Sequence, residues 1–263
     1  MELGLEDKVA LVAASSRGLG RAIAGELARE GASLVMCARE ALPLDRAARE
    51  IAEQTGTSPV AIAADVSRAD DVARLVDAAL ARFGRIDVLV TNAGGPPPGP
   101  FETHDAAAWE RAFRLTLASA VELTRRVLPD MKRRRWGRII NVTSITVKQP
   151  VDNLILSNSL RAAVTGFART LANEVAALGI TVNNVLPGYT RTERVDELAA
   201  ARSAREGITT DAVRAELERQ IPAGRLGEPD ELAALTAFLA SERAAYITGQ
   251  SIAVDGGWIR SLY

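Results

Sequence analysis

Short apolar segments rich in β-branched residues alternate along the chain with longer segments in which apolar residues recur every three or four positions. The short segments have the length and composition of strands buried on both faces of a sheet. The longer segments are typical of amphipathic helices. This alternation predicts an α/β fold, a parallel sheet with helices on both faces. The predicted strands are 9–13, 33–37, 60–64, 87–91, 138–142, 181–186 and 251–254, and the clearest predicted helices are 19–30, 69–83 and 164–178.

No repeat, linker or shift in composition divides the 263 residues. The sequence therefore predicts one doubly wound, Rossmann-type domain over residues 1–263. The proline-rich segment 94–100 directly follows a predicted strand, so we interpret it as a rigid loop at a pocket rim rather than a linker. Segment 189–222 has amphipathic, charge-rich halves and is predicted to be a mobile substrate lid, with a fixed surface hairpin as the alternative.

Composition narrows the possible partners. The net charge of −1 provides no field of one sign for nucleic acid or an anionic membrane. The basic run 132–138 is interpreted as a helix C-terminus, where cations complement the helix dipole. Cys37 is the only cysteine, which excludes an intramolecular disulfide and a cysteine-based metal site. We expect a soluble, cytoplasmic protein with no metal, no membrane contact and no nucleic-acid partner.

The first chemical motif is a turn, residues 14–20, between a predicted strand and a predicted helix. Amides at the start of such a helix bind the diphosphate of a dinucleotide. Glycines in the turn allow close approach of the backbone, and the serines can offer hydroxyls to phosphate. The candidate cofactor-binding residues of this turn are Ser15, Ser16, Arg17, Gly18, Leu19 and Gly20.

Further motifs follow in a fixed order: Asp65-Val66, "TNAG" at 91–94, "PG" at 187–188 with Thr192 after it, and a closing segment at 224–257. With the glycine turn, they make nearly the whole chain resemble the short-chain dehydrogenase/reductase family. The resemblance implies that family's nucleotide-binding fold and oxidoreduction of carbonyl or alcohol groups. It also implies further cofactor contacts at Asp65, Val66, Asn92, Ala93, Gly94, Pro187, Gly188 and Thr192.

The cofactor turn departs from the family pattern at its first glycine, where Ala14 stands. A Cβ at this position is expected to resist positive φ. At the end of the second strand, Ala38 replaces the acid that usually binds the ribose hydroxyls of NAD. Arg39 and Arg17 can instead meet a 2′-phosphate with charge-assisted bonds, which predicts NADP in preference to NAD. The alternative is that both arginines are solvated surface residues.

The resemblance also locates the family's catalytic tetrad of Asn, Ser, Tyr and Lys. Ser144, at the end of "NVTS", takes the serine position. Ser157 stands in the tyrosine position, thirteen residues on, and Arg161 in the lysine position. Thr116 occupies the asparagine position. For Ser157 and Thr116, local helix hydrogen bonds are the alternative interpretation.

These replacements change the expected chemistry. A serine hydroxyl is a far weaker acid than a phenol with a pKa near about 10, and its side chain is shorter. Arg161 lies one helical turn from Ser157 and can bind the nicotinamide ribose, but a guanidinium with a pKa above about 12 does not shuttle protons. Lys148, on the loop after Ser144, is a candidate replacement acid if confinement beside Arg161 lowers its pKa; otherwise it is a solvated lysine.

The sequence therefore predicts an NADP-dependent oxidoreductase that resembles 3-oxoacyl-acyl-carrier-protein reductases but has a non-standard active site. The alternative is a non-catalytic NADP-binding or regulatory protein. The expected partner of the oxidoreductase is a small-molecule carbonyl or alcohol substrate, free or carrier-linked. The family resemblance implies a homotetramer, with the helix containing Ser157 and the C-terminal segment at its interfaces.

Overall fold

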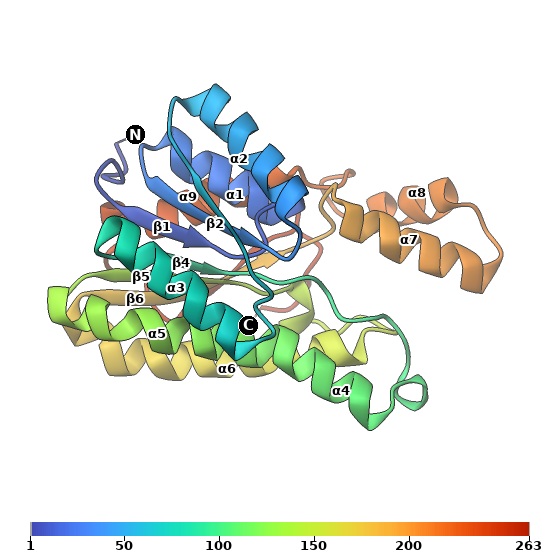
Figure 1. Cartoon of the computed structure of the whole chain (residues 1–263). Coiled ribbons are helices and arrows are strands. Elements are labelled where there is room, and N and C mark those ends of the chain that lie inside the picture. The colour runs from blue at the N-terminus through green and yellow to red at the C-terminus, as the bar shows by residue number, and fades with distance from the viewer. Residues whose placement is uncertain (1, 263) are drawn as a thin grey trace.

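Seven parallel strands form one sheet in the computed structural model, which describes residues 2–262 (Figure 1). Their order is β3-β2-β1-β4-β5-β6-β7, which confirms the predicted doubly wound α/β fold. Every predicted strand is present. The strands are β1 (Val9–Val12), β2 (Ser33–Ala38), β3 (Val60–Ala63), β4 (Val88–Thr91), β5 (Gly137–Val142), β6 (Ile180–Pro187) and β7 (Ser251–Val254).

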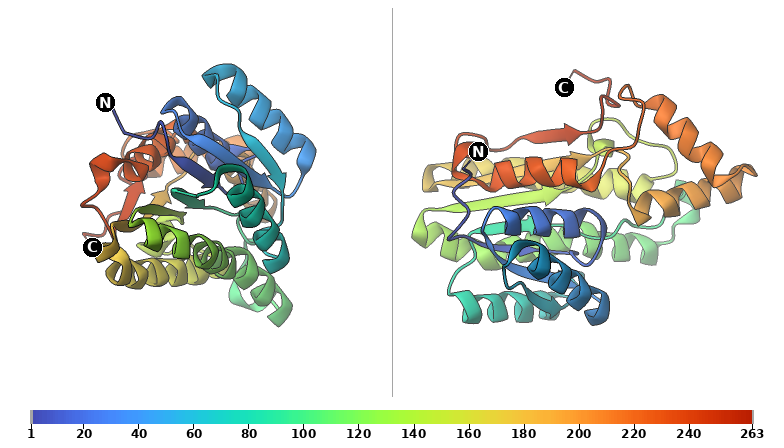
Figure 2. Two further views of the ribbon diagram at one scale, coloured as in Figure 1. Left: turned by 60° about the vertical axis from the view of Figure 1, so that its left-hand side comes forward. Right: turned by 90° about the horizontal axis from the view of Figure 1, so that it is seen from above.

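Helices cover both faces of the sheet (Figures 1 and 2). On one face pack α1 (Gly18–Arg29), α2 (Ala41–Thr55) and α9 (Pro229–Ala240). On the other pack α3 (Ala69–Phe83), α5 (Ser119–Arg134) and α6 (Ile155–Val175). Successive strand residues point to opposite faces, so Val12 belongs to the first core and Leu11 to the second. This double burial explains why the strands are continuous apolar runs.

A row of hydrogen-bonded polar side chains crosses four neighbouring strands of the sheet, from Thr91 on β4 to Ser251 on β7. Thr91 donates to Asn141 at 2.7 Å, Asn141 to Asn184 at 3.1 Å and Asn184 to Ser251 at 3.1 Å. These residues are direct neighbours in the strand register. Because each donor has its acceptor on the next strand, the row satisfies polar groups within the sheet and helps to fix the register of these four strands.

A helical hairpin, α7 (Glu193–Glu206) and α8 (Thr210–Gln220), projects beyond the carboxyl ends of the strands (Figure 1). Its base is a narrow neck, where the amide of Arg191 donates to Gly227 O at 2.8 Å and the amide of Gly227 donates to Tyr189 O at 2.9 Å. The hairpin falls within the segment predicted to be a substrate lid. Its motion stays a prediction.

The basic run at 132–138 ends α5 and leads into β5, as predicted. Arg134 donates to Asp130 and Ile86 O, at 2.8 and 2.9 Å, and Arg138 is almost fully buried against the Ser241 and Gly179 carbonyls. Within residues 2–262, no helix is long and apolar enough to cross a membrane. The same residues contain no group of three or more His, Cys, Asp or Glu side chains that could hold a metal ion.

Cys37 lies near the end of β2, fully buried, with its Sγ 3.7 Å from Ala64 O. Burial raises the pKa of this thiol to about 12. The sulfur therefore stays protonated and acts as a small apolar core group.

Candidate active site

The cleft opens where the sheet changes direction. From β1 the chain turns to α1 on one face, whereas the loops after β4 and β5 lead toward helices on the other. Ligands of doubly wound sheets bind in the crevice beyond the carboxyl ends of the strands, at this switch point. The residues predicted to bind the cofactor gather here from strand ends far apart in the sequence.

The turn after β1 holds its backbone in an unusual conformation. Ala14 has a φ of 50°, so it adopts the left-handed conformation that it was expected to resist. A Cβ added to Gly20 would lie 2.2 Å from Ala14 O, which makes glycine obligatory there. Asn92 closes the turn from the β4 side, because its Nδ2 donates to Ala14 O at 3.4 Å. The turn is thus built for close backbone packing at a strain of about 1 kcal/mol.

The amino terminus of α1 is open to an anion. Its N-cap residue, Arg17, makes no capping hydrogen bond, and its first turn carries no acidic residue. Gly18, at a φ of 54°, and the following amides are therefore available to a phosphate group. The residues present fit the diphosphate of a dinucleotide.

One expectation for this turn is wrong. Ser15 is fully buried, and its Oγ donates to Val12 O at 3.0 Å and accepts from the Cys37 amide at 3.0 Å. Its hydroxyl fastens β1 to β2 and is not offered to a ligand. Ser16 and Leu19 are half-buried.

The residues predicted to choose between NADP and NAD lie around the ends of β2 and β3. Arg17 and Arg39 are exposed. Ala38 pairs with Ala63 in the strand register, so Asp65 and Val66 follow β3 close to the Arg39 position. Asp65 Oδ1 accepts from the amide and hydroxyl of Ser67 at 2.9 and 2.7 Å, which orders this loop, while Val66 is buried.

The far wall of the cleft comes from the ends of β4 and β6. Ala93 is half-buried and Gly94 exposed after Asn92. Gly188, after Pro187, packs on β7, where a Cβ would lie 2.6 Å from Asp255 Cα. Thr192 is the N-cap residue of α7, and its side chain lies 3.7 Å from the Cβ position of Gly18. The neck of the hairpin therefore crosses directly over the glycine turn.

Ser157 and Arg161 meet at the end of β5. Arg161 Nε donates to Ser157 Oγ at 3.2 Å, and its Nη1 donates to Val142 O and Thr143 O at 3.1 and 2.7 Å. Burial, and to a smaller extent the positive charge of Arg194, lowers the pKa of Arg161 to about 10. The guanidinium is still a cation at neutral pH and holds the Ser157 hydroxyl as an acceptor.

Ser144 and Lys148 lie on the loop after β5. Ser144 is half-buried, and its Oγ accepts from the Thr146 amide at 3.1 Å, which leaves its own proton available to a ligand. Lys148 is exposed, directly after the short helix Ile145–Val147. This exposure agrees with the solvated-lysine alternative and argues against the confinement beside Arg161 that a replacement acid requires.

Thr116 lies in a π-helical segment, Arg114–Ala118, between α4 (Ala106–Phe113) and α5. Its Oγ1 is buried and has no hydrogen-bond partner among the described residues. Thr116 and Arg161 both line a cavity of about 20 Å³, room for about one water molecule. Such π-bulges are frequent at functional sites.

Arg194 was not singled out by the sequence patterns. Its Nη2 donates to Pro96 O at 2.8 Å, and a Cβ on Gly95 would lie 2.6 Å from its guanidinium. Arg194 therefore spans from the start of α7 to the loop after β4. Its position two residues after Thr192 was the signal that could have pointed to it.

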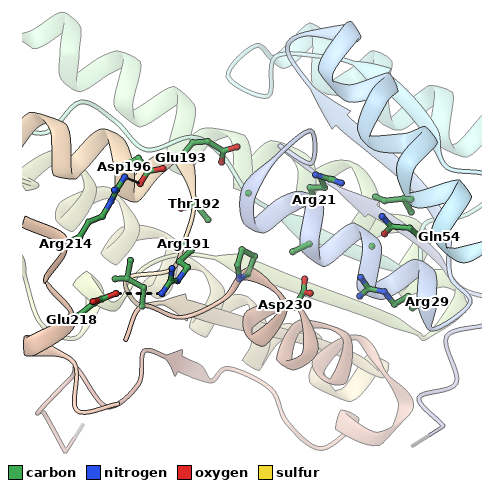
Figure 3. Close-up of a pocket in the computed structure, with 16 residues that line it drawn as sticks. Arg21, Arg29, Gln54, Arg191, Thr192, Glu193, Asp196, Arg214, Glu218 and Asp230 are labelled. Atoms are coloured by element: carbon green, nitrogen blue, oxygen red, sulfur yellow. Dashed lines mark hydrogen bonds and ion pairs between the residues drawn. The ribbon is translucent and has the colours of Figure 1, made fainter. Parts of the chain in front are cut away.

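A groove of about 750 Å³ continues from Gly18 and Thr192 along α1 toward α9 and the hairpin (Figure 3). Its arginines are paired with carboxylates: Arg21 with Glu50, Arg191 with Glu218 and Glu228, and Arg214 with Asp196 and Asp211. Positive and negative side chains therefore largely cancel along the groove that borders the glycine turn.

This fold, with its glycine turn and its strand-end motifs, defines a class of nucleotide-dependent oxidoreductases, and the chain belongs to the short-chain dehydrogenase/reductase family. Residues 13–259 match the family described as Enoyl-(Acyl carrier protein) reductase. The chain is 36% identical over 255 residues to a 3-oxoacyl-[acyl-carrier-protein] reductase of Vibrio cholerae, covering 97% of this chain and 98% of the relative. It is 35% identical to a D-beta-hydroxybutyrate dehydrogenase of Cupriavidus necator, covering 97% and 99%.

Solved structures agree with this placement. The L-sorbose reductase of Gluconobacter frateurii, in complex with NADPH and L-sorbose, superimposes with a TM-score of 0.94 at 34% identity, over 100% of both chains. The NADPH-dependent reductase YwfH, involved in bacilysin biosynthesis, gives 0.92 at 30% identity, covering 97% of this chain and 99% of that one. The chain is accordingly an NAD(P)-dependent oxidoreductase of the short-chain type, similar to 3-oxoacyl-acyl-carrier-protein reductases.

Proposed function

We propose that this protein is an NADP-dependent carbonyl or alcohol oxidoreductase with a non-standard active site. One observation carries the proposal: Asn92 links the uncapped start of α1 to Arg161, because its side chain donates to Ala14 O in the glycine turn and lines the same small cavity as the Arg161 guanidinium. The exposed Arg17 and Arg39 support NADP rather than NAD, since guanidinium groups bind phosphate strongly and no acid at Ala38 repels it.

The catalytic contribution of the chain is electrostatic. When bound, the nicotinamide ring donates or accepts the hydride. Arg161 provides a fixed cation beside the cofactor cleft, which stabilises negative charge developing on a substrate oxygen and can bind ribose hydroxyls. Ser144 is free to donate its hydroxyl proton in a hydrogen bond to the same oxygen. Neither group is a general acid near neutral pH.

The proton has to come from another source. The described residues lining the cavity beside Thr116 and Arg161 include no phenol, imidazole or amine. The cavity is large enough for about one water molecule, and Thr116 Oγ1 is a hydroxyl without a protein partner there. We therefore assign proton supply to water held in this cavity, at a slower rate than a tuned acid gives.

The substrate is a small-molecule carbonyl or alcohol, free or carrier-linked, that enters between the 94–100 loop and the α7–α8 hairpin acting as a lid. The names of the relatives given above support this substrate class: one is a 3-oxoacyl-[acyl-carrier-protein] reductase, one a D-beta-hydroxybutyrate dehydrogenase and one an L-sorbose reductase. A homotetramer formed through α6 and the C-terminal segment is part of the proposal. Light scattering of the purified chain measures that state.

A non-catalytic NADP-binding or regulatory protein is the second candidate. The hydrogen bond from Arg161 to Ser157 favours it, because the pair holds the strand end together without any group of suitable acidity. A regulatory protein of this kind would bind the nucleotide in the cleft without catalysing a reaction.

Two measurements separate the candidates. Fluorescence titration with NADPH and NADH measures binding, and NADPH oxidation with 3-oxoacyl thioesters, β-diketones and ketoses measures turnover. Binding with turnover supports the oxidoreductase, and binding without turnover on any carbonyl supports the regulatory protein. A folded chain that binds neither nucleotide contradicts both.

A further inference from the structure

We propose that Arg194 binds the diphosphate of the dinucleotide from the hairpin side of the cleft, an inference that rests on the proposed binding of NADP. The sequence motifs place the diphosphate on the α1 amides alone. The structure adds a second wall above it, because the chain from Thr192 to Arg194 crosses the cleft directly over the glycine turn.

Distances on both sides of the cleft locate this crossing. On the α1 side, the Cβ position of Gly18 lies 3.7 Å from the Thr192 side chain and 3.5 Å from the Glu193 carboxylate. On the β4 side, the Arg194 guanidinium contacts Gly95 and donates to Pro96 O at 2.8 Å. A dinucleotide running from the glycine turn to the end of β4 therefore passes beneath Arg194.

The carboxylate of Glu193 favours a cation at the position of Arg194. Glu193 is exposed and lies close to the amides that would hold the phosphates, so its carboxylate opposes a diphosphate. The groove arginines next to it are already paired with carboxylates. Arg194 is itself bound only to a peptide carbonyl and to the exposed Glu197, at 3.2 Å, in the described contacts. A diphosphate is a stronger partner than either.

The field of Arg194 already reaches into the cleft. Its positive charge is one of the two influences that lower the pKa of the buried Arg161. Two guanidinium groups therefore flank segment 91–96, Arg161 beside Asn92 and Ala93, and Arg194 beside Gly95 and Pro96. An anion between them relieves their mutual repulsion. Binding the diphosphate consequently holds the start of α7 down on the cleft.

The test is equilibrium binding by Arg194→Met, with Arg205→Met as the matched control, since Arg205 lies on the same helix in an exposed ion pair with Glu206. Three nucleotides are titrated: NADPH, NADH and 2′-AMP, which lacks a diphosphate. Arg194→Met should weaken NADPH and NADH alike, by roughly tenfold to a hundredfold, the worth of one or two charge-assisted hydrogen bonds. It should leave 2′-AMP affinity unchanged, which also shows that the variant is folded.

A second variant tests whether removing a negative charge strengthens dinucleotide binding. Glu193→Gln removes the opposing carboxylate and should strengthen both dinucleotides by about two- to fivefold. Hydrogen exchange of the α7–α8 amides should slow on adding NADPH to the wild-type protein, and much less in Arg194→Met.

The outcomes are distinguishable. If the wild-type chain binds no dinucleotide, the proposed function fails. If the wild-type chain binds NADPH and the Arg194→Met variant binds NADPH equally well, the proposed role of Arg194 is overturned. In that case, an effect of the variant that is confined to carboxylate-bearing substrates would assign Arg194 to substrate binding instead. An equal loss of 2′-AMP affinity would also overturn the inference, because the loss would not lie at the diphosphate.

Discussion

Arg161 Nε donates a hydrogen bond to Ser157 Oγ at 3.2 Å, across one turn of α6. The same guanidinium holds the carbonyls of Val142 and Thr143 at the end of β5. A cation is thus retained where the family resemblance places a lysine, but its neighbour can only accept its hydrogen bond. In the mechanism that we propose, charge stabilisation and proton donation are therefore separated, whereas one residue pair combines them in the family pattern.

Restoring a phenol and an amine at the tyrosine and lysine positions of the family should raise the rate of turnover. The double variant Ser157→Tyr with Arg161→Lys reintroduces a phenol beside an amine, and a positioned general acid contributes about 10²- to 10⁴-fold. Turnover of NADPH with the best carbonyl substrate should rise at least about tenfold over the wild-type rate. Ser157→Tyr alone is the control, since the bulky phenol then meets an unaltered Arg161. A folded, NADPH-binding double variant without any gain would show that Thr116 or the substrate pocket also limits the reaction.

Cofactor choice should depend on Arg17 and Arg39 together. Replacing both by Ala removes the charge-assisted bonds to the 2′-phosphate, each worth about 1.5 to 3 kcal/mol. NADPH affinity should fall about 10²-fold or more, while NADH affinity changes little. Titration of both nucleotides with wild-type and variant protein measures this directly. If the ratio of NADPH to NADH affinity is the same in the variant and the wild-type protein, the 2′-phosphate does not bind at Arg17 and Arg39.

The strained turn should limit stability. Ala14 has a φ of 50°, where glycine is free of the Cβ penalty. Ala14→Gly should raise the free energy of unfolding by about 0.5 to 1 kcal/mol, part of the gain being offset by the freer unfolded chain. Gly20→Ala is the opposing control, because its Cβ would lie 2.2 Å from Ala14 O. Among the wild-type protein and the two variants, Ala14→Gly should have the highest midpoint of thermal unfolding. A midpoint below that of the wild-type protein would show that Ala14 is not strained.

Cofactor affinity should fall at alkaline pH. Burial and the charge of Arg194 lower the pKa of Arg161 to about 10, so this cation is fully present at pH 8 and is lost as the pH rises through about 10. NADPH binding should weaken several-fold between about pH 8 and pH 10.5, the range of that titration. Arg161→Met should bind more weakly at pH 8 and show a flatter profile. Parallel pH profiles for the two proteins would exclude Arg161 as the titrating group.

The fold was predictable because it depends on periodicity. Seven apolar runs correspond to seven strands, and the glycine turn lies where the sequence indicated. The site was predictable only where a motif fixes the backbone. Ser15 was misassigned because a strand-end hydroxyl can serve a neighbouring strand as easily as a ligand. The sequence left Lys148 open between a confined acid and a solvated lysine, because spacing along a loop does not determine which way a side chain points. Arg194 was missed because its contact with Pro96 joins segments 98 residues apart.

The burial of Cys37 has a practical consequence for following the hairpin in solution. The only thiol of the chain has a pKa of about 12 and no exposed surface, so maleimide and similar reagents should not reach it while the protein is folded. Ala204, exposed on α7, can then be replaced by cysteine without first removing a native one. A fluorophore on that single reactive sulfur would report the position of α7 over the cleft in real time.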